Sequence, residues 1–266
     1  MKKITVLGGD NRQKILCEAL RKNGFSVDTL GLYDFDEGDI KTSEIVILPV
    51  PTTRDGKTVF CPLTNRNITL GSIENTITDN QLILCCNYLF NNKKCVDYGA
   101  LDSYALLNAI PTAEGAVKLA VENTPFTLWQ AKVLVIGFGR VGKILADRLK
   151  GMGALVTVTA RKPAALSLAE ALGFSTINTN DLNGKDLNYG IIFNTVDHKV
   201  IEDENTHKIR CDLVIDLATK EGISLEKCKE MGINAIKAPG LPSKVAPLTA
   251  AEILSNTVLH IINSYN

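Results

Sequence analysis

Short apolar runs alternate with helical patterns along almost the whole chain. Between the first two runs, Ile15, Leu16, Ala19 and Leu20 recur at the spacing of one helix face. Continuous apolar strands separated by helices are typical of a parallel sheet covered on both faces. In the first half, the runs that predict strands are KITVLG (3–8), SVDTLG (26–31), EIVILPV (44–50) and QLILCC (81–86).

The second half repeats this alternation. Helices are predicted over 140–150, 164–172 and 224–232. The fold class expected is therefore α/β, with two tandem doubly wound, Rossmann-like domains and parallel sheets. The strands predicted here are KVLVIG (132–137), ALVTVTA (154–160), YGIIFNT (189–195), CDLVIDLA (211–218) and the short INAIKAPG (233–240).

Two segments are expected to connect the domains. A helix is predicted to begin near Pro111, with Thr112 or Asn108 as its cap, and to run to about Asn123. A long C-terminal helix (246–265) is expected to return to the first domain. The predicted domains are residues 1–123 with 243–266 for the substrate, and 124–242 for the nucleotide. Two crossings of this kind predict a hinge over a cleft.

Composition narrows the function classes. The chain has 29 Lys plus Arg and 29 Asp plus Glu, so a formal net charge of zero gives no sign of nucleic-acid or membrane binding. No apolar run reaches the roughly 18 residues of a membrane span, and the N-terminus lacks the apolar stretch of a signal peptide. A cytoplasmic protein is expected. Seven cysteines without a CxxC pair and three scattered histidines indicate free thiols and no metal site.

The segment VIGFGRVG (135–142) is typical of a dinucleotide-binding turn, because it joins a predicted strand to a predicted helix. Gly137, Gly139 and Gly142 fit G-x-G-x-x-G: a tight turn, a close approach of pyrophosphate to the backbone, and close helix–strand packing. The helix N-terminus adds an anion site. Cofactor contacts are predicted for the whole turn, including Phe138, Arg140 and Val141.

The end of the next strand favours NADP over NAD. An NAD site usually carries an acidic residue there, whereas this chain has Ala160-Arg161-Lys162. Arg161 is predicted to bind the 2′-phosphate, supported by Lys162 or Thr159, since a guanidinium suits a phosphate dianion. Further cofactor contacts, mainly through the backbone, are predicted at later strand ends: Asn194, Thr195, Val196, Leu217, Ala218, Pro239 and Gly240.

The first domain offers a second glycine loop, GGDNRQ (8–13). Gly9 and Arg12 are predicted to bind an anionic substrate, while Asp10 either caps the helix or contacts substrate. In PVPTTRDG (49–56), Thr52 and Thr53 either donate to substrate or form an ordinary turn.

The segments expected to cross between the domains also carry polar groups. In PTAEG (111–115), Pro111 and Thr112 are predicted to face substrate, and Glu114 either completes a capping box or acts in acid–base chemistry. In GLPSKVAP (240–247), Ser243, Lys244 and Val245 are predicted to form another anion-binding edge. With no histidine at these positions, the general base is expected among Asp10, Glu114 and Lys244, or is water.

Together, GGDNRQ, ILPVPTT, NAIPTAEGA, VIGFGRVGK, the DLA at 216–218 and APGLPSKVAPLTAAEIL resemble the A subunit family of dipicolinate synthase, in order and over nearly the whole chain. Ser243-Lys244 departs from the GLPGxVAP pattern of that family. The resemblance implies NADP-dependent oxidation and dehydration of a hydroxylated tetrahydrodipicolinate to dipicolinate. It also implies that the partner is a flavoprotein-like B subunit, and that the protein works in the mother cell of a sporulating bacterium. A homo-oligomer is expected as well.

Two other functions stay open at this point. One is a different dehydrogenase of a small carboxylate, such as a 2-hydroxyacid or alanine dehydrogenase; these enzymes set a histidine beside a carboxylate, and His198 lies near a predicted strand end. The other is a non-catalytic, NADP-binding sensor.

Overall fold

The computed structural model of the chain describes residues 2–36, 38–91 and 93–265. They form two compact units, and each is described by itself. Unit 1 comprises Met1–Asn108 and Ala246–Asn266, and unit 2 comprises Ala109–Val245. The divisions therefore fall after Asn108 and Val245, whereas the sequence placed them after residues 123 and 242.

Unit 1 is built on a five-stranded parallel sheet in the order β2-β1-β3-β4-β5. Its strands are β1 (Lys3–Leu7), β2 (Ser26–Leu30), β3 (Ile45–Ile47), β4 (Leu82–Cys85) and β5 (Cys95–Asp97), and its helices are α1 (Asn11–Lys22), α2 (Leu70–Thr76), the start of α3 (Asp102–Asn123), α8 (Pro247–Ser264) and the 3-10 turns η1 (Ile40–Thr42) and η2 (Tyr98–Ala100).

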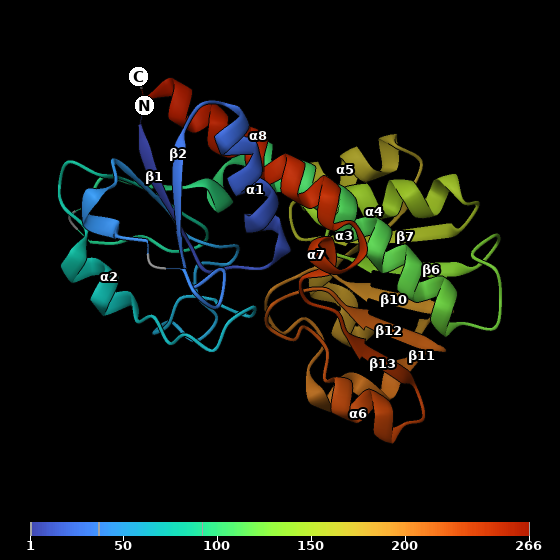
Figure 1. Cartoon of the computed structure of the whole chain (residues 1–266). Helices are drawn as coiled ribbons and strands as arrows, with labels where there is room; N and C mark the ends of the chain where they lie inside the picture. Colours follow the sequence, from blue (N-terminus) through green and yellow to red (C-terminus); the bar gives the residue numbers. More distant parts are fainter. Residues whose placement is uncertain (1, 37, 92, 266) are drawn as a thin grey trace. The chain divides into compact units, whose positions relative to one another are not determined.

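The C-terminal helix α8 returns to unit 1 and packs beside α1 (Figure 1). Leu16 and Leu20 of α1 share a buried core with Leu254 and Val258 of α8. These positions follow the helical spacing that the sequence predicts. The last helix packs on unit 1, and not on unit 2, because this buries the apolar faces of both α1 and α8. The predicted return of this helix is confirmed.

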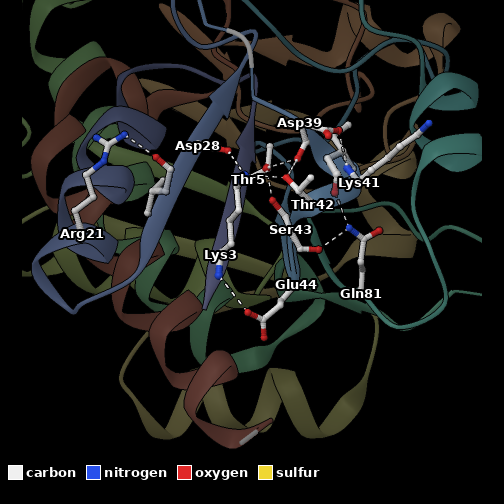
Figure 2. Close-up of polar contacts among 12 residues, drawn as sticks. Lys3, Thr5, Arg21, Asp28, Asp39, Lys41, Thr42, Ser43, Glu44 and Gln81 are labelled. Atoms are coloured by element: carbon white, nitrogen blue, oxygen red, sulfur yellow. Dashed lines mark hydrogen bonds and ion pairs between the residues drawn. The ribbon is translucent and has the colours of Figure 1, made fainter. Parts of the chain in front are cut away.

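A polar network fastens the segment before β3 to the sheet (Figure 2). The buried Gln81 donates from Nε2 to the carbonyl oxygens of Ile40 and Ser43, both at 2.6 Å, and its Oε1 accepts the amide of Thr78 at 2.7 Å. The hydroxyls of Thr5 and Ser43 are 2.5 Å apart. Each amide atom of Gln81 thus has a partner, as is usual for a buried side chain.

Unit 2 has a six-stranded parallel sheet in the order β13-β12-β10-β6-β7-β8, and a small two-stranded sheet, β11-β9. Its strands are β6 (Lys132–Ile136), β7 (Leu155–Ala160), β8 (Ser175–Asn178), β9 (Leu187–Asn188), β10 (Ile191–Asn194), β11 (Ile209–Arg210), β12 (Leu213–Asp216) and β13 (Asn234–Lys237). Its helices are α4 (Arg140–Gly151), α5 (Pro163–Ala171), α6 (Leu225–Glu230), α7 (Leu241–Val245), the larger part of α3, and the 3-10 helices η3 (Thr179–Gly184) and η4 (Asp203–Lys208).

These two parallel sheets confirm the predicted fold class, and all nine predicted strands are present. The strands and helices that the sequence analysis missed are short or polar. Among them are α2, β5 and the edge strand β8, which carry too little apolar periodicity to be recognised.

The start of α3 was predicted wrongly. The helix begins at Asp102, so Pro111 lies inside it and is buried. Proline lacks the N–H that would bond to the carbonyl of Leu107, and this usually ends a helix. Here the apolar spacing of Ala109, Ala113, Ala116 and Ala120 continues through the proline, and burial of that face favours the uninterrupted helix.

Candidate functional site

The glycine turn after β6 has the geometry that its spacing predicts. Gly137 has a φ of +98°, which disfavours other residues, and a Cβ there would lie 2.5 Å from Oγ1 of Thr195. A Cβ on Gly142 would collide with the carbonyl oxygen of Gly137. Gly137 therefore allows the turn, and Gly142 lets α4 approach the strand.

Gly139 differs from its two neighbours because a Cβ there would meet no heavy atom within 4 Å. Gly139 is the N-cap residue of α4, so no side chain bonds to the free amides there, and the first turn of α4 has no acidic side chain. An open backbone before a helix N-terminus with no carboxylate is what a pyrophosphate requires. The turn thus fits a dinucleotide, and the exposed Gly139 and Arg140 lie where it would bind.

Phe138 contributes to this turn through its backbone. Its side chain is buried in the core of unit 2 and meets the ring of Phe174 edge-on, with centroids 5.9 Å apart. Val141 is partly buried. Thr195, which follows β10, donates from its hydroxyl and its amide to the carbonyl of Ile136, both at 2.9 Å, and so supports the turn.

The predicted contact at Asn194 needs correction. Asn194 is fully buried; its Nδ2 donates to Oδ2 of Asp216 at 3.1 Å and to the carbonyl of Val196 at 3.0 Å, while its Oδ1 accepts the amide of Val196. Both amide atoms of the side chain are therefore already bonded within unit 2, and neither is left for a cofactor. Its role is to join the ends of β10 and β12.

Asp216 is the centre of this network and is fully buried. Besides Asn194, its carboxylate accepts the amides of Ala218 (3.0 Å) and Gly222 (2.9 Å) and pairs with Nζ of Lys237 at 3.1 Å. The amide of Leu217 donates to the carbonyl of Asn194 at 2.9 Å. The amide N–H groups of Thr195, Val196, Leu217 and Ala218 are thus used inside unit 2, and cofactor contacts of these residues stay predictions.

Arg161 and Lys162 lie exposed directly after β7, next to the strand that carries the glycine turn. No carboxylate stands at this strand end. Thr159 cannot support a 2′-phosphate, because it is fully buried and its hydroxyl accepts the amide of Gly137 at 3.2 Å and the hydroxyl of Thr179 at 3.0 Å. Arg161 and Lys162 remain as the predicted phosphate ligands.

The segment after β13, predicted to form an anion-binding edge, is partly helical: it contains α7. Pro239 and Gly240 are exposed, and Gly240 has a φ of +68°. Ser243 donates to the carbonyl of Gly240 at 3.1 Å, and Lys244 is exposed. Val245 packs against α3, where a Cβ on Gly115 would lie 3.0 Å from its Cγ2. Val245 is therefore a packing residue in unit 2.

Glu114 does not form the capping box predicted for it, because it lies in the middle of α3 rather than at its start. Its exposed carboxylate is 3.9 Å from Nε of Arg148. Thr112 is partly buried on the same helix. Acid–base roles for Glu114 and Lys244, and substrate contacts of Thr112 and Ser243, stay predictions.

In unit 1 the loop after β1 is closed against its neighbours. The amide of Gly8 donates to the carbonyl of Leu30 at 2.8 Å, and that of Gly9 donates to the carbonyl of Phe60 at 2.7 Å. Both glycines have positive φ, +50° and +92°. The fold therefore already uses the Gly9 amide, and substrate binding by Gly9 stays a prediction.

Asp10 and Arg12 form a pair at the start of α1. Asp10 caps the helix by accepting a hydrogen bond from the amide of Arg12, which is one of the two predicted alternatives. Its carboxylate also accepts hydrogen bonds from Nε of Arg12 at 2.9 Å and from Nη2 at 2.8 Å. Nη2 of Arg12 donates further to the carbonyl of Val50 at 2.7 Å. Burial lowers the pKa of Arg12, but bonding and attraction to Asp10 outweigh it and raise the pKa, so the guanidinium stays charged.

The predicted contact between Thr52 and substrate also needs correction. It is fully buried, and its hydroxyl accepts the amide of Cys86 at 2.8 Å, so it joins the segment after β3 to the end of β4. The hydroxyl of Thr53 donates to Asp55 at 3.0 Å and accepts the amide of Gly56 at 3.0 Å. This is the ordinary turn that the sequence left as the alternative, with Asp55 at its centre.

Sequence reasoning missed three polar side chains, one at a strand end and two on helices. Lys237, at the end of β13, is the ion-pair partner of Asp216. Gln13 and Tyr104 are buried in unit 1, and neither was predicted as a site residue. Gln13 is the last residue of GGDNRQ, which could have signalled it, whereas Tyr104 belongs to no motif that the sequence singles out. Among the described residues, no group of three potential metal ligands occurs, and none of the described helices has the length and apolarity to cross a bilayer.

The two parallel sheets and the glycine turn define the class: a two-unit protein of the Rossmann type. Comparison with known proteins goes further. Residues 3–98 match the family model for the N-terminal domain of the dipicolinate synthase A subunit. The chain is 29% identical to the A subunit of dipicolinate synthase from Bacillus subtilis, over 98% of its length and 95% of that protein. These matches bear out the resemblance that the motifs carry: the chain is similar to the dipicolinate synthase A subunit over nearly its whole length.

Solved structures agree. The A subunit of dipicolinate synthase from Bacillus halodurans matches with a TM-score of 0.86 and 28% identity, over 98% of this chain and 97% of that one. Its counterpart from Bacillus subtilis matches equally well, at 0.86 and 27%, over 99% and 96% of the chains. An L-alanine dehydrogenase shares the fold with a TM-score of 0.64 at 14% identity, over 98% of this chain and 88% of that one.

Proposed function

We propose that this chain is an NADP-dependent oxidoreductase, the A subunit of a dipicolinate synthase. It oxidises 4-hydroxy-tetrahydrodipicolinate, with loss of water, to the aromatic pyridine-2,6-dicarboxylate. The observation that carries the proposal is the open Gly139 before a helix N-terminus with no acidic first turn, in a chain whose two halves both match this family.

NADP is the proposed cofactor, and it would accept the hydride when bound. The first turn of α4 would hold its pyrophosphate, with Gly137 and Gly142 shaping the turn. Arg161 and Lys162 would hold the 2′-phosphate, since both are exposed at the end of β7 and a guanidinium binds a phosphate through charge-assisted hydrogen bonds. The same proposal includes a homo-oligomer, a partner B subunit, and the mother cell of a sporulating bacterium.

The test is turnover by the full chain, with and without the B subunit. Freshly generated 4-hydroxy-tetrahydrodipicolinate is supplied with NADP or NAD, and the absorbance of the reduced cofactor and of the pyridine product is followed. Product formation with NADP well above NAD is expected. No turnover in any combination, despite measurable NADP binding, would contradict the proposal and favour a sensor or another substrate.

The Arg161 assignment has its own matched pair of variants. Arg161→Ala is expected to raise the apparent dissociation constant of NADP by roughly ten- to a hundredfold, because one or two charge-assisted hydrogen bonds are lost. The dissociation constant of NAD should change little. Arg210→Ala removes another exposed arginine of unit 2 and should change neither. Equal losses for both cofactors with Arg161→Ala would disprove the 2′-phosphate role.

A further inference from the structure

Two buried polar side chains in unit 1 have no hydrogen-bond partner among the described residues. They are Gln13, whose Nε2 and Oε1 are both unpaired, and Tyr104, whose hydroxyl is unpaired. Gln13 is fully buried and Tyr104 is 3% exposed. Buried polar groups nearly always have a hydrogen-bond partner, and leaving one unpaired lowers the stability of the folded state. Two unpaired side chains in one unit therefore indicate a partner outside the chain.

Both side chains lie at the carboxyl edge of the sheet. A Cβ on Gly9, just after β1, would lie 2.5 Å from the amide carbon of Gln13. The ring of Tyr104 lies 5.6 Å from the ring of Tyr98, whose hydroxyl donates to the carbonyl of Leu48, directly after β3. Ligands of open parallel α/β sheets bind at this edge.

Their neighbours give the edge its chemistry. Arg12 is 5% exposed, keeps its charge through Asp10, and reaches the carbonyl of Val50 after β3. Burial raises the pKa of Tyr104, the largest influence on it, so its hydroxyl stays protonated and can donate. The edge therefore combines a fixed cation with a hydroxyl donor and an amide donor.

We propose that Gln13 and Tyr104 bind the substrate in unit 1. Nε2 of Gln13 and the hydroxyl of Tyr104 donate to carboxylate oxygens of the cyclic dicarboxylate, and Oε1 of Gln13 accepts from a hydroxyl or N–H of the same ligand. This inference rests on the proposed function, and it assigns substrate recognition to two side chains that were not among the residues predicted from the sequence to bind substrate.

Two other residues of unit 1 supply matched controls. Gln81 is also a buried glutamine, but each of its amide atoms is bonded: Nε2 to the carbonyl oxygens of Ile40 and Ser43, and Oε1 to the amide of Thr78. Tyr98 is also buried, 5.6 Å from the ring of Tyr104, but its hydroxyl donates to the carbonyl of Leu48 at 2.8 Å. Each pair thus compares an unpaired group with a paired group of the same type.

The experiment uses the full chain and pyridine-2,6-dicarboxylate, the proposed product, as the probe. Calorimetry gives its dissociation constant, and thermal unfolding is measured without ligand for Gln13→Met, Tyr104→Phe, Gln81→Met and Tyr98→Phe. Gln13→Met and Tyr104→Phe are each expected to weaken probe binding roughly tenfold, for one lost hydrogen bond to a charged group, without lowering the melting temperature. Gln81→Met and Tyr98→Phe should lower the melting temperature, and Gln81→Met should leave probe binding unchanged.

The outcomes separate this inference from the function on which it rests. If the wild-type chain turns over substrate and both Gln13→Met and Tyr104→Phe bind the probe as the wild type does, the inference is wrong and the function stands; an internal water then satisfies these groups. If the wild-type chain neither turns over substrate nor binds the probe, both are wrong. Should one variant fail to fold, the dissociation constant of the other decides.

Discussion

The carboxylate of Asp10 holds Arg12 at three points: the backbone amide at 3.1 Å, Nε at 2.9 Å and Nη2 at 2.8 Å. One side chain thus caps the start of a helix and pairs with a guanidinium that is almost completely buried. The position that an anion would take at the N-terminus of α1 is filled by the protein's own carboxylate. In this respect the two glycine loops differ, because the N-terminus of α4 has no acidic side chain in its first turn.

The two roles of Asp10 can be measured separately. Asp10→Asn keeps a side-chain acceptor for the helix cap and loses the charge, whereas Asp10→Ala loses both. The Ala variant is expected to be less stable than the Asn variant by about 1 kcal/mol, the usual value of an N-cap. Urea unfolding of both variants gives the difference. Equal stabilities would mean that the cap contributes nothing beyond the ion pair.

Two glycines of the turn in unit 2, Gly142 and Gly139, are expected to respond differently to substitution by alanine. Gly142→Ala places a methyl group against the carbonyl of Gly137 and should lower the free energy of unfolding by about 1–3 kcal/mol. Gly139→Ala meets open space, so its stability should stay within about 0.5 kcal/mol of the wild type.

Gly139→Ala should nevertheless weaken NADP binding roughly tenfold, since the methyl group occupies the approach of the pyrophosphate. Thermal melts and a fluorescence titration with NADP measure the two effects. Unchanged NADP affinity in Gly139→Ala would place the cofactor elsewhere.

The buried carboxylate of Asp216 is expected to be essential for the stability of unit 2. Asp216→Asn removes the negative charge facing Lys237 and points an amide donor at other donors, so the free energy of unfolding should fall by about 3 kcal/mol. As control, Asp79→Asn breaks the pair with Lys93, in which Asp79 is 85% exposed, and should cost less than about 1 kcal/mol. Similar losses in both variants would contradict this view of Asp216.

The ionisation of Asp36 is expected to make the free energy of unfolding fall in acid. Burial raises its pKa, but the amides of Tyr33, Leu32 and Gly31 and the charge of Arg66 outweigh this and lower it. A carboxyl whose folded pKa lies below its unfolded value, about 3.9, contributes stability that is fully present above that value. This contribution is lost as the pH falls through the folded pKa.

The measurement is urea unfolding of the wild type and of Asp36→Asn between about pH 3 and pH 6. The wild type should be the more stable at pH 6, and the difference should shrink as the solution becomes more acidic. A difference that is constant across the range would show that the ionisation of Asp36 does not affect stability.

The sequence by itself determined the fold class, the returning helix and the glycine turn. Each is encoded locally: apolar runs of four to six residues predict strands, the spacing of Leu254, Val258 and Ile262 predicts a helix, and three glycines at fixed spacing predict a turn. It could not place the start of α3, because Pro111 is a local signal for a helix start that the packing of Ala109 and Ala113 overrides.

Only the tertiary structure decided which polar groups stay available for a ligand. Gly9, Thr52 and Asn194 are donors or acceptors by sequence, but their hydrogen bonds go to Phe60, Cys86 and Asp216, residues 22 to 51 positions away along the chain. Gln13 and Tyr104 are left unpaired for the same reason. Whether a polar group is satisfied depends on which distant segments fold against it, and no local pattern of residues records this.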